Sequence, residues 1–396
     1  MMGVSSEIKS PECVFTQSPG ESRHRPELDG VRGIALLAVM ISHGGPKIIR
    51  DGLLAKIIVY SMIPGWSGVE LFFVLSGFLI TGILLKTKSA ENYFSSFYAR
   101  RFLRIFPIYY FALTVGILFA SHSSWWNALL PPMLKTRIAY YFYLQNWPVF
   151  WRNGLALPGS VFGHFWSLAV EEQFYLVWPL VIWLLPERAV LRICTAGLIV
   201  ALPLRVVMVH RFAEDFTAMT LTSSRVDGLL VGVILAILLR RGQIPMRWIA
   251  LTLFSGGLII GYIALFHHRE LIATYFYMPT IGITGFSLLA GGLLALSQHP
   301  IGWLRWILTG KTLRTIGKYS YGMYIYHIPV FVICDRILVA HLGLPVPMPL
   351  RFAVFYLLGL FCATFLIAKL SYDYFESRIL ALKRFFEPRY RPIDFN

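Results

Sequence analysis

The sequence predicts an all-α, polytopic transmembrane helical bundle of about ten spans with both termini in the cytoplasm. Three observations predict this fold class. Of the 396 residues, 57% are hydrophobic and only 14% are charged, and a soluble domain of this size has no use for so much apolar surface. The apolar residues gather in runs about as long as a bilayer is thick. Lys and Arg lie mainly in alternate loops between these runs.

The expected spans follow from the apolar runs, each long enough to cross a hydrocarbon core of about 30 Å. They cover roughly residues 28–45, 66–85, 103–121, 165–185, 190–209, 223–239, 248–266, 273–296, 319–339 and 351–371. The two tails and every second loop hold 22 of the 36 Lys and Arg residues, whereas the opposite loops hold 8. Because basic residues concentrate in cytoplasmic loops, this asymmetry places both termini in the cytoplasm.

The chain divides into a polar tail over residues 1–25, a transmembrane domain over 26–372 and a basic cytoplasmic tail over 373–396. The first tail lacks the apolar core of a signal peptide. Residues 122–164 are too polar at each end for a clean span, yet they include a strongly aromatic stretch. We interpret them as an external loop with an interfacial or re-entrant piece, and two short spans are the alternative. The aromatic residues favour anchoring at the membrane surface over stacking on sugar rings.

The formal net charge of +16 does not indicate nucleic-acid binding. The basic residues flank apolar runs, so the membrane explains them better than a nucleic acid does. The four cysteines show neither paired spacing nor the spacing of metal ligands. No zinc-ligand pattern, P-loop or dinucleotide fingerprint is present, and we expect no metal site.

An Arg-x10-His spacing joins Arg32 to His43 in the first span, RPELDGVRGIALLAVMISHGG. An ionisable side chain inside a membrane span is costly and by default indicates a functional site. The two residues are about 16 Å apart along a helix. The pair therefore links the cytoplasmic face to a point deep in the membrane, and His43 is the candidate catalytic group.

Arg101 and Arg104 form an Arg-x-x-Arg pair in ARRFLRIFPIYY, close to the cytoplasmic face. Residues three apart share one face of a helix. Two guanidinium groups on one face suit a phosphate-bearing ligand. The alternative is the ordinary excess of basic residues beside a span.

Further charged residues are expected near the outer face, at the depth of His43: Glu70, Glu171, Glu172, Arg225 and Asp227. Carboxylates inside a span are costly unless they pair or line a polar cavity. A carboxylate beside His43 would orient the imidazole for general base catalysis. The alternative is a structural polar network that holds the helices together.

His327 lies about 12 Å into the ninth expected span, in GKYSYGMYIYHIPV. Two roles are possible for His327. It could line a substrate passage together with Tyr324, or it could form a structural hydrogen bond between helices. Glycines inside the spans, such as Gly77 and Gly291, are expected to allow close helix packing rather than hinge motion.

Taken together, these motifs identify a resemblance. The chain resembles the acyltransferase 3 family of bacterial integral membrane acyltransferases. The matching stretches are ELDGVRGIALLAVMISH, GVELFFVLSGFLIT, RRFLRIFP, FWSLAVEEQFYLVWP, SRVDGLLVG and YSYGMYIYHIP, in the family's order from about residue 26 to 330. One departure is Glu70, where the family more often has Asp.

The resemblance implies a multi-pass enzyme of the bacterial cytoplasmic (inner) membrane. It implies transfer of an acyl group, usually acetyl, from cytoplasmic acyl-CoA to a hydroxyl of a carbohydrate or a macrolide. Arg32 and His43 match the family's essential pair, and Arg101 and Arg104 match its second arginine motif. Glu171 matches the glutamate of the W-S-L-x-V-E stretch. Many relatives carry a fused hydrolase-like domain. We expect no such domain here, and therefore either direct acylation or a separate extracytoplasmic protein that accepts the acyl group.

These expectations combine into one mechanism. Arg101 and Arg104, helped by Arg32, bind the acyl-CoA phosphates, and the extended arm of the donor reaches His43. Arg32, Glu70 and Glu171 are expected to be catalytic together with His43, with the two carboxylates near the incoming acceptor hydroxyl. The residues expected to bind the acceptor are Glu172, Arg225, Asp227, His327 and Tyr324. His43 acts either as general base or as a transient acyl carrier. A transporter or flippase of a glycolipid is the competing class, because intramembrane charges suit that class too.

Overall fold

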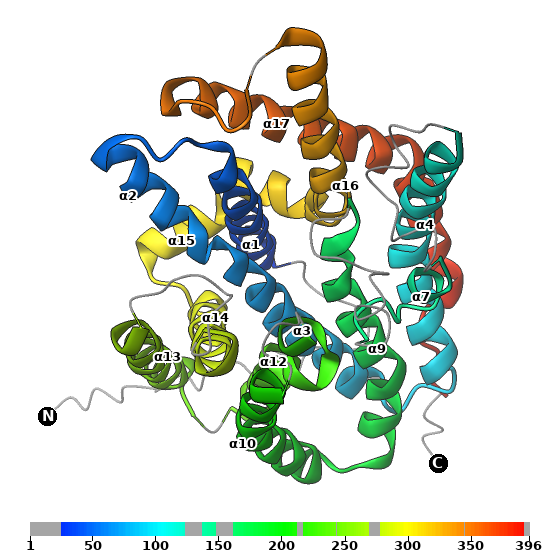
Figure 1. Cartoon of the computed structure of the whole chain (residues 1–396). Coiled ribbons are helices and arrows are strands. Elements are labelled where there is room, and N and C mark those ends of the chain that lie inside the picture. The colour runs from blue at the N-terminus through cyan, green and yellow to red at the C-terminus, as the bar shows by residue number, and fades with distance from the viewer. Residues whose placement is uncertain are drawn as a thin grey trace, which may run out of the picture.

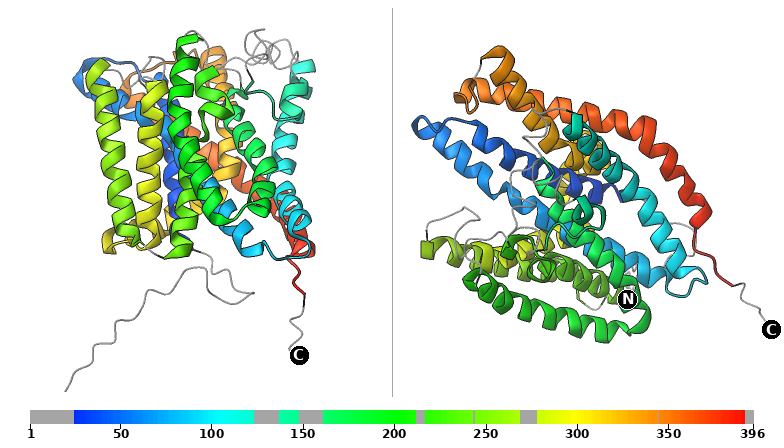
Figure 2. Two further views of the ribbon diagram at one scale, coloured as in Figure 1. Left: turned by 90° about the horizontal axis from the view of Figure 1, so that it is seen from below. Right: turned by 45° about the vertical axis from the view of Figure 1, so that its right-hand side comes forward.

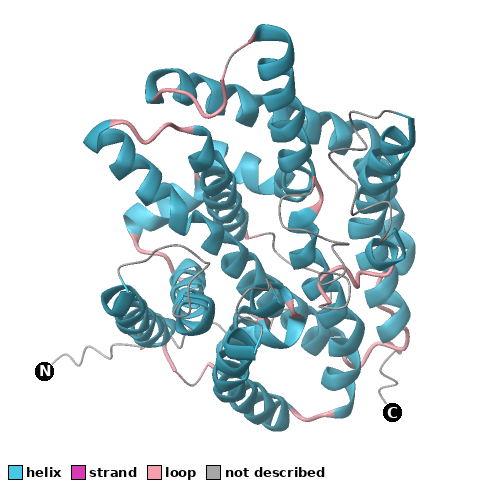
Figure 3. Ribbon diagram, in the orientation of Figure 1, coloured by secondary structure: helices cyan, strands magenta, loops and turns pink. Residues whose placement is uncertain are grey.

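The computed structural model describes residues 25–122, 137–147, 161–211, 217–242, 244–268, 278–343 and 345–391. Throughout these ranges the regular structure is helical and no strand is formed (Figure 3). One isolated parallel bridge joins Ile48 to Met348. The predicted all-α class is therefore confirmed.

The main helices form one bundle, viewed along its length in Figure 1 and from the side in Figure 2. They are α1 (Pro26–Gly44), α2 (Gly52–Met62), α3 (Gly68–Thr87), α4 (Tyr93–His122), α7 (Arg137–Tyr141), α9 (Trp166–Leu184), α10 (Glu187–Arg211), α11 (Thr217–Thr220), α12 (Val226–Arg241), α13 (Met246–His268), α14 (Ile283–Gln298), α15 (Gly302–Thr309), α16 (Lys311–Leu342) and α17 (Leu350–Ser371).

A helix lies at each of the ten apolar runs, but only six stretches are long and apolar enough to cross a membrane by length and composition. These are Gly52–Thr87, Tyr93–Phe119, Glu187–Arg211, Thr280–Gln298, Lys311–Val339 and Leu350–Phe386. The other helices are shorter or carry more charge: α12 has only 16 residues, and α1 contains Glu27, Asp29 and Arg32. The structure thus shows a multi-pass membrane protein, and the count of ten spans stays a prediction.

Segments that the charge pattern assigns to the same side of the membrane are joined by hydrogen bonds. This is expected if successive helices cross the membrane in alternate directions. Arg25, just before α1, donates to Gln298 at the end of α14. Lys88, after α3, donates to the carbonyl of Leu185, after α9. Each contact joins two segments that the charge pattern assigns to the same side of the membrane.

Glycines sit where helices touch. A Cβ added at Gly77 of α3 would lie 2.0 Å from the Leu229 carbonyl oxygen of α12. A Cβ added at Gly317 of α16 would lie 1.9 Å from the Asp29 carbonyl oxygen of α1. Only glycine allows backbones to approach so closely. The packing role expected for Gly77 is therefore confirmed.

The aromatic segment after α4 is described only over residues 137–147 and from 161 onward. Tyr140 and Tyr143 are buried in the core, and Tyr143 has a positive φ of 55°. Gln145 donates to the Phe165 carbonyl at 2.8 Å. This part of the segment packs into the bundle, whereas Trp147 stays exposed. The rest of the predicted external loop lies outside the described residues.

The segment predicted as a basic tail continues the fold in its described part. The turns η6 (Tyr372–Glu376), α18 (Ser377–Leu380) and η7 (Ala381–Phe386) extend α17. Ser96 of α4 donates to the Phe386 carbonyl, and Asn92 donates to that of Glu387. Residues 373–391 are therefore held against the start of α4, and the proposed boundary at 372 stays a prediction.

Candidate functional site

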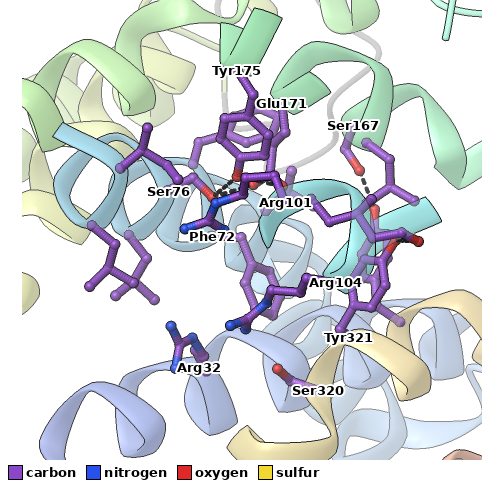
Figure 4. Close-up of a pocket in the computed structure, with 18 of the residues that line it drawn as sticks. Arg32, Phe72, Ser76, Arg101, Arg104, Ser167, Glu171, Tyr175, Ser320 and Tyr321 are labelled. Carbon is purple, nitrogen blue, oxygen red and sulfur yellow. Dashed lines mark hydrogen bonds between the residues drawn. The ribbon is translucent and has the colours of Figure 1, made fainter. Parts of the chain in front are cut away.

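A cavity of about 200 Å³ lies inside the bundle, lined by side chains of α1, α3, α4, α9 and α16 (Figure 4). Along α3 its lining extends from Val69 to Ile83. The fourteen steps between these two residues correspond to about 21 Å of helix at roughly 1.5 Å per residue. Its small volume over that length makes the cavity a narrow passage along α3.

Three arginines face this passage: Arg32 from α1, and Arg101 and Arg104 from α4. The guanidinium groups of Arg32 and Arg104 point toward one another across it (Figure 4). Arg32 also pairs with Asp29 at 2.8 Å. Among the described residues, no carboxylate lies within 4.0 Å of Arg101 or Arg104. Unpaired guanidinium groups around a cavity make a ready site for an anion such as a phosphate.

Glu171 lies in the same cavity, together with Ser76 of α3 and Tyr175 of α9. Ser76 donates to Glu171 at 2.6 Å. The Tyr175 hydroxyl donates to Ser76 at 2.9 Å and to the second Glu171 oxygen at 3.3 Å. The guanidinium of Arg101 lies 5.5 Å from the centre of the Tyr175 ring. This network fixes the direction of the carboxylate.

The position of Glu171 differs from the prediction, which placed it with His43 among the outer carboxylates. The structure instead brings it together with the arginines. The reason is rotation: Glu171 lies on the face of α9 that Ser76 of α3 touches, and apolar periodicity does not fix which neighbour a helix face meets. Ser76 and Tyr175 were not anticipated, although Tyr175 is one turn from Glu171 and therefore on its face.

Tyr324 of α16 and Ser167 of α9 line the other end of the passage. Their hydroxyls are 2.5 Å apart, and Ser167 also donates to the His164 carbonyl at 3.1 Å. The Tyr324 hydroxyl donates to that carbonyl at 3.1 Å as well. Tyr324 therefore lines the passage, and its role in binding the substrate stays a prediction. Ser320 and Tyr321 of α16 line it too.

His43 does not line this passage and belongs to a row of three histidines directly behind Tyr324. The rings of His43 and His327 are 5.1 Å apart between centroids, and those of His327 and His164 are 4.8 Å apart. His164 lies in η3 (Gly163–Phe165), the turn that leads into α9. Sequence reasoning did not select His164, because nothing in the spacing of FGHFW indicates that it reaches α16.

The tautomer of His43 follows from its hydrogen bond. Its Nδ1 lies 2.9 Å from the Val39 carbonyl oxygen, which can only accept, so Nδ1 carries the hydrogen. The lone pair is then on Nε2, for which no hydrogen-bond partner is found among the described residues. A free imidazole lone pair is what a general base or an acyl carrier needs. No described carboxylate hydrogen-bonds to His43, so the carboxylate partner expected beside it is absent from that part of the chain.

Glu70, Arg225 and Asp227 gather in a separate cluster that is completely buried. Arg225 pairs with Glu70, whose other oxygen accepts from Ser287 at 2.8 Å. Asp227 takes two hydrogen bonds, at 2.9 and 2.7 Å, from Arg205 of α10. None of these side chains lines the passage. The sequence did not indicate Arg205, because the partners lie 22 residues apart on different helices.

Each carboxylate of this cluster thus meets a guanidinium, which suits the structural alternative stated above. Glu172, next to Glu171 on α9, does not line the passage. In the residues that the structure describes, no group of three or more His, Cys, Asp or Glu side chains is arranged to hold a metal ion.

Comparisons with known proteins identify the family of the chain. Residues 25–369 match a family model described as an acyltransferase domain. The chain is 28% identical over 375 residues to the peptidoglycan O-acetyltransferase OatA of Listeria monocytogenes serovar 1/2a, a match that covers 90% of this chain and 56% of that protein. It is 27% identical over 376 residues to the O-acetyltransferase OatA of Staphylococcus aureus (strain NCTC 8325 / PS 47), over 90% of this chain and 57% of that protein.

The chain therefore spans little more than half the length of these relatives. No solved structure shows a significant match to it. The family match includes every helix that lines the passage and both arginine motifs. On this ground the chain belongs to the acyltransferase 3 family.

Proposed function

We propose that this protein is a membrane O-acetyltransferase that moves an acetyl group from acyl-CoA to a hydroxyl of a carbohydrate. The observation that supports this most is the passage along α3, which begins among three arginines and ends at Tyr324, against the histidine row. The names of the relatives support an O-acetyl group and a carbohydrate acceptor.

The donor would bind with its phosphates at Arg101, Arg104 and Arg32, and its pantetheine arm would follow α3. The passage extends about 21 Å along that helix, which an extended arm of this kind can cover. The thioester would then lie at Tyr324, next to His43 and His327. The apolar side chains of Phe72, Phe73 and Leu168 along the way suit an uncharged arm better than a charged substrate.

In the reaction, His43 Nε2 would remove the proton from the acceptor hydroxyl, and the alkoxide would attack the thioester carbonyl. The carbon–sulfur bond then breaks, and the His43 imidazolium returns the proton to the thiolate. In the covalent variant, Nε2 itself attacks the thioester carbonyl, the carbon–sulfur bond breaks and CoA leaves as the thiolate. The acetyl-imidazolium then passes the acetyl group to the acceptor hydroxyl, whose proton goes to the thiolate and leaves His43 neutral. Both routes need the lone pair on Nε2 that the hydrogen bond from Nδ1 to Val39 leaves free.

This function includes the proposed orientation: ten spans, both termini in the cytoplasm, the arginine end facing the cytoplasm and His43 near the outer face of a bacterial inner membrane. Acyl-CoA and the lipid bilayer are the partners that follow from it. The acceptor is proposed as a glycan. A macrolide acceptor, or a separate extracytoplasmic protein that accepts the acetyl group, is the alternative outcome of an acceptor survey.

The decisive experiment measures free thiol released from acetyl-CoA by the purified protein in detergent, with glycan fragments as acceptors. Wild type should release thiol and His43→Ala should not, while both still bind the donor. His341→Ala is the matched control, because His341 is an exposed histidine near the end of α16. Thiol release by a folded His43→Ala protein, or none by wild type with any acceptor, would contradict the proposal.

Sidedness is tested with oriented vesicles and acetyl-CoA labelled in the acetyl group. We expect consumption only when the donor is supplied on the side of Arg101 and Arg104. Consumption from the opposite side would overturn the orientation without affecting the reaction type.

A further inference from the structure

The three histidines of the row come from three separate elements, α1, η3 and α16, and they meet inside the bundle. His327 is fully buried, and 9% of His164 is exposed. Burying one imidazole requires satisfied hydrogen bonds, and burying two in contact beside a half-buried third is more demanding. The row therefore needs an explanation beyond packing.

The hydrogen bonds fix two more tautomers. Nε2 of His164 and Nδ1 of His327 both donate to the Tyr324 carbonyl oxygen, at 3.0 and 2.7 Å. A carbonyl oxygen accepts and has two lone pairs, so both nitrogens carry hydrogens. The lone pairs are then on Nδ1 of His164 and Nε2 of His327. Both atoms are buried and have no hydrogen-bond partner within the described part of the chain.

An unpaired buried acceptor is costly, so two of them in one row call for a functional explanation. All three rings, including His43, hold a lone pair that no described donor uses. The row therefore has acceptor nitrogens but no N–H group to donate to them. The proposed reaction supplies one, because His43 gains an N–H when it takes the proton from the acceptor hydroxyl.

The charged groups around His43 do not offer another way to stabilise an imidazolium. Lys47 of η1 (Gly45–Lys47) is its charged neighbour. Lys47 pairs with Asp335 of α16, which also accepts from the Tyr356 hydroxyl of α17 at 2.6 Å. That carboxylate is thus already occupied.

In the remaining described elements that pack against α1, no free carboxylate lies near His43 either. Glu70 of α3 pairs with Arg225, and Arg305 of α15 lies at the opposite end of α1, near Glu27. The sequence of α2 contains neither Asp nor Glu. The neutral imidazoles are the acceptors that remain beside His43.

We propose that His327 is a positioning residue for His43: its Nε2 lone pair accepts the N–H of the protonated His43 and holds the imidazolium until the thiolate takes the proton. His164 donates a hydrogen bond to the same Tyr324 carbonyl oxygen that accepts from Nδ1 of His327. This shared acceptor holds both rings in the stated tautomers. The proton moves from the hydroxyl oxygen to His43 Nε2 and then to the CoA sulfur, and His327 neither gains nor loses one. This inference rests on the proposed acetyl transfer.

The test compares His327→Phe, which keeps a ring and removes the lone pair, with His327→Gln, which keeps an acceptor. We expect kcat of His327→Phe to fall about 10- to 100-fold, with an unchanged KM for acetyl-CoA. The acid limb of its pH–rate profile should move to lower pH, because the imidazolium of His43 becomes less stable relative to the neutral ring. His327→Gln should recover part of kcat and part of the shift.

The two proposals fail in different ways. If wild type does not turn over acetyl-CoA, the proposed function fails. If wild type is active and His327→Phe has the same kcat and the same acid limb, only the role of His327 is overturned. Equal losses in the Phe and Gln variants, with no change in the pH profile, would likewise show a merely structural role. If the Phe variant does not fold, His327→Leu takes its place on the same readouts.

Discussion

The bundle contains two groups of arginines and carboxylates, one on each side of α3. On one side, Ser76 and other residues of α3 line the passage. There, Arg101 and Arg104 have no carboxylate partner among the described residues. On the other side, Glu70 faces the cluster in which each arginine meets a carboxylate. Buried charges that are paired hold a fold together, whereas unpaired guanidinium groups around a cavity await a ligand. The same residue types thus serve binding on one side and structure on the other.

The largest effect should come from breaking a pair on the structural side. Asp227→Ala leaves Arg205 buried without its carboxylate, which costs about 3–5 kcal/mol. We expect a large drop in melting temperature in detergent and poor recovery of monodisperse protein. Asp373→Ala is the matched control, because it breaks the solvent-exposed Lys369–Asp373 pair, and exposed ion pairs contribute little to stability. Similar melting temperatures for the two variants would erase the distinction between the sides.

The second-largest effect is expected on the passage side, where a substitution should reduce binding and leave stability unchanged. Arg104→Ala should weaken donor binding by about 1.5–3 kcal/mol, the value of a hydrogen bond to a charged group, and leave the melting temperature nearly unchanged. Titration calorimetry with acetyl-CoA measures the first and thermal unfolding the second. Arg100→Ala, on the same helix but not lining the passage, should bind the donor normally. A loss of stability without a loss of binding would place Arg104 among the structural residues.

A third comparison uses neighbours on α3 itself. Gly77→Ala forces a methyl group against the Leu229 carbonyl, and overpacking of this kind costs about 1–3 kcal/mol. Donor binding by the protein that folds should stay close to wild type. Gly359→Ala, where a Cβ meets nothing within 4 Å, is the control. An unchanged melting temperature in Gly77→Ala would mean that α3 and α12 can move apart freely.

Salt should give the smallest difference. Raising the ionic strength screens charges that water can reach and hardly affects buried pairs. Donor binding should therefore weaken a few-fold between low and moderately high salt, while the melting temperature of the unliganded protein stays constant. Calorimetry and thermal unfolding across a salt series measure both. Binding that is insensitive to salt would argue against phosphate recognition by Arg101 and Arg104.

The sequence could predict the relative positions of residues that lie on the same helix. Arg101 and Arg104 share a face because they are three apart, and Arg32 and His43 share α1 at a separation that follows from helix rise. Each of these relations is local, and the structure places the three arginines in one cavity. The positions of the helices along the chain follow from apolar runs for the same reason.

Relations between helices were not accessible in this way. The meeting of His164 with His327, the pairing of Arg205 with Asp227 and the placement of Glu171 among the arginines all depend on how each helix is rotated toward its neighbours. Rotation is set by the packing of many side chains and by close contacts at glycines. A periodic apolar pattern cannot specify it when helices are apolar on nearly every side.

The sequence by itself thus determined the all-α membrane class, the helices along the chain and the residue types available for acyl transfer, because these depend on composition and local periodicity. Only the tertiary structure decided which charges are paired and which remain free. The separation of the arginine passage from the buried ion pairs arises from contacts between segments far apart in the chain, in a medium where every uncompensated charge is costly.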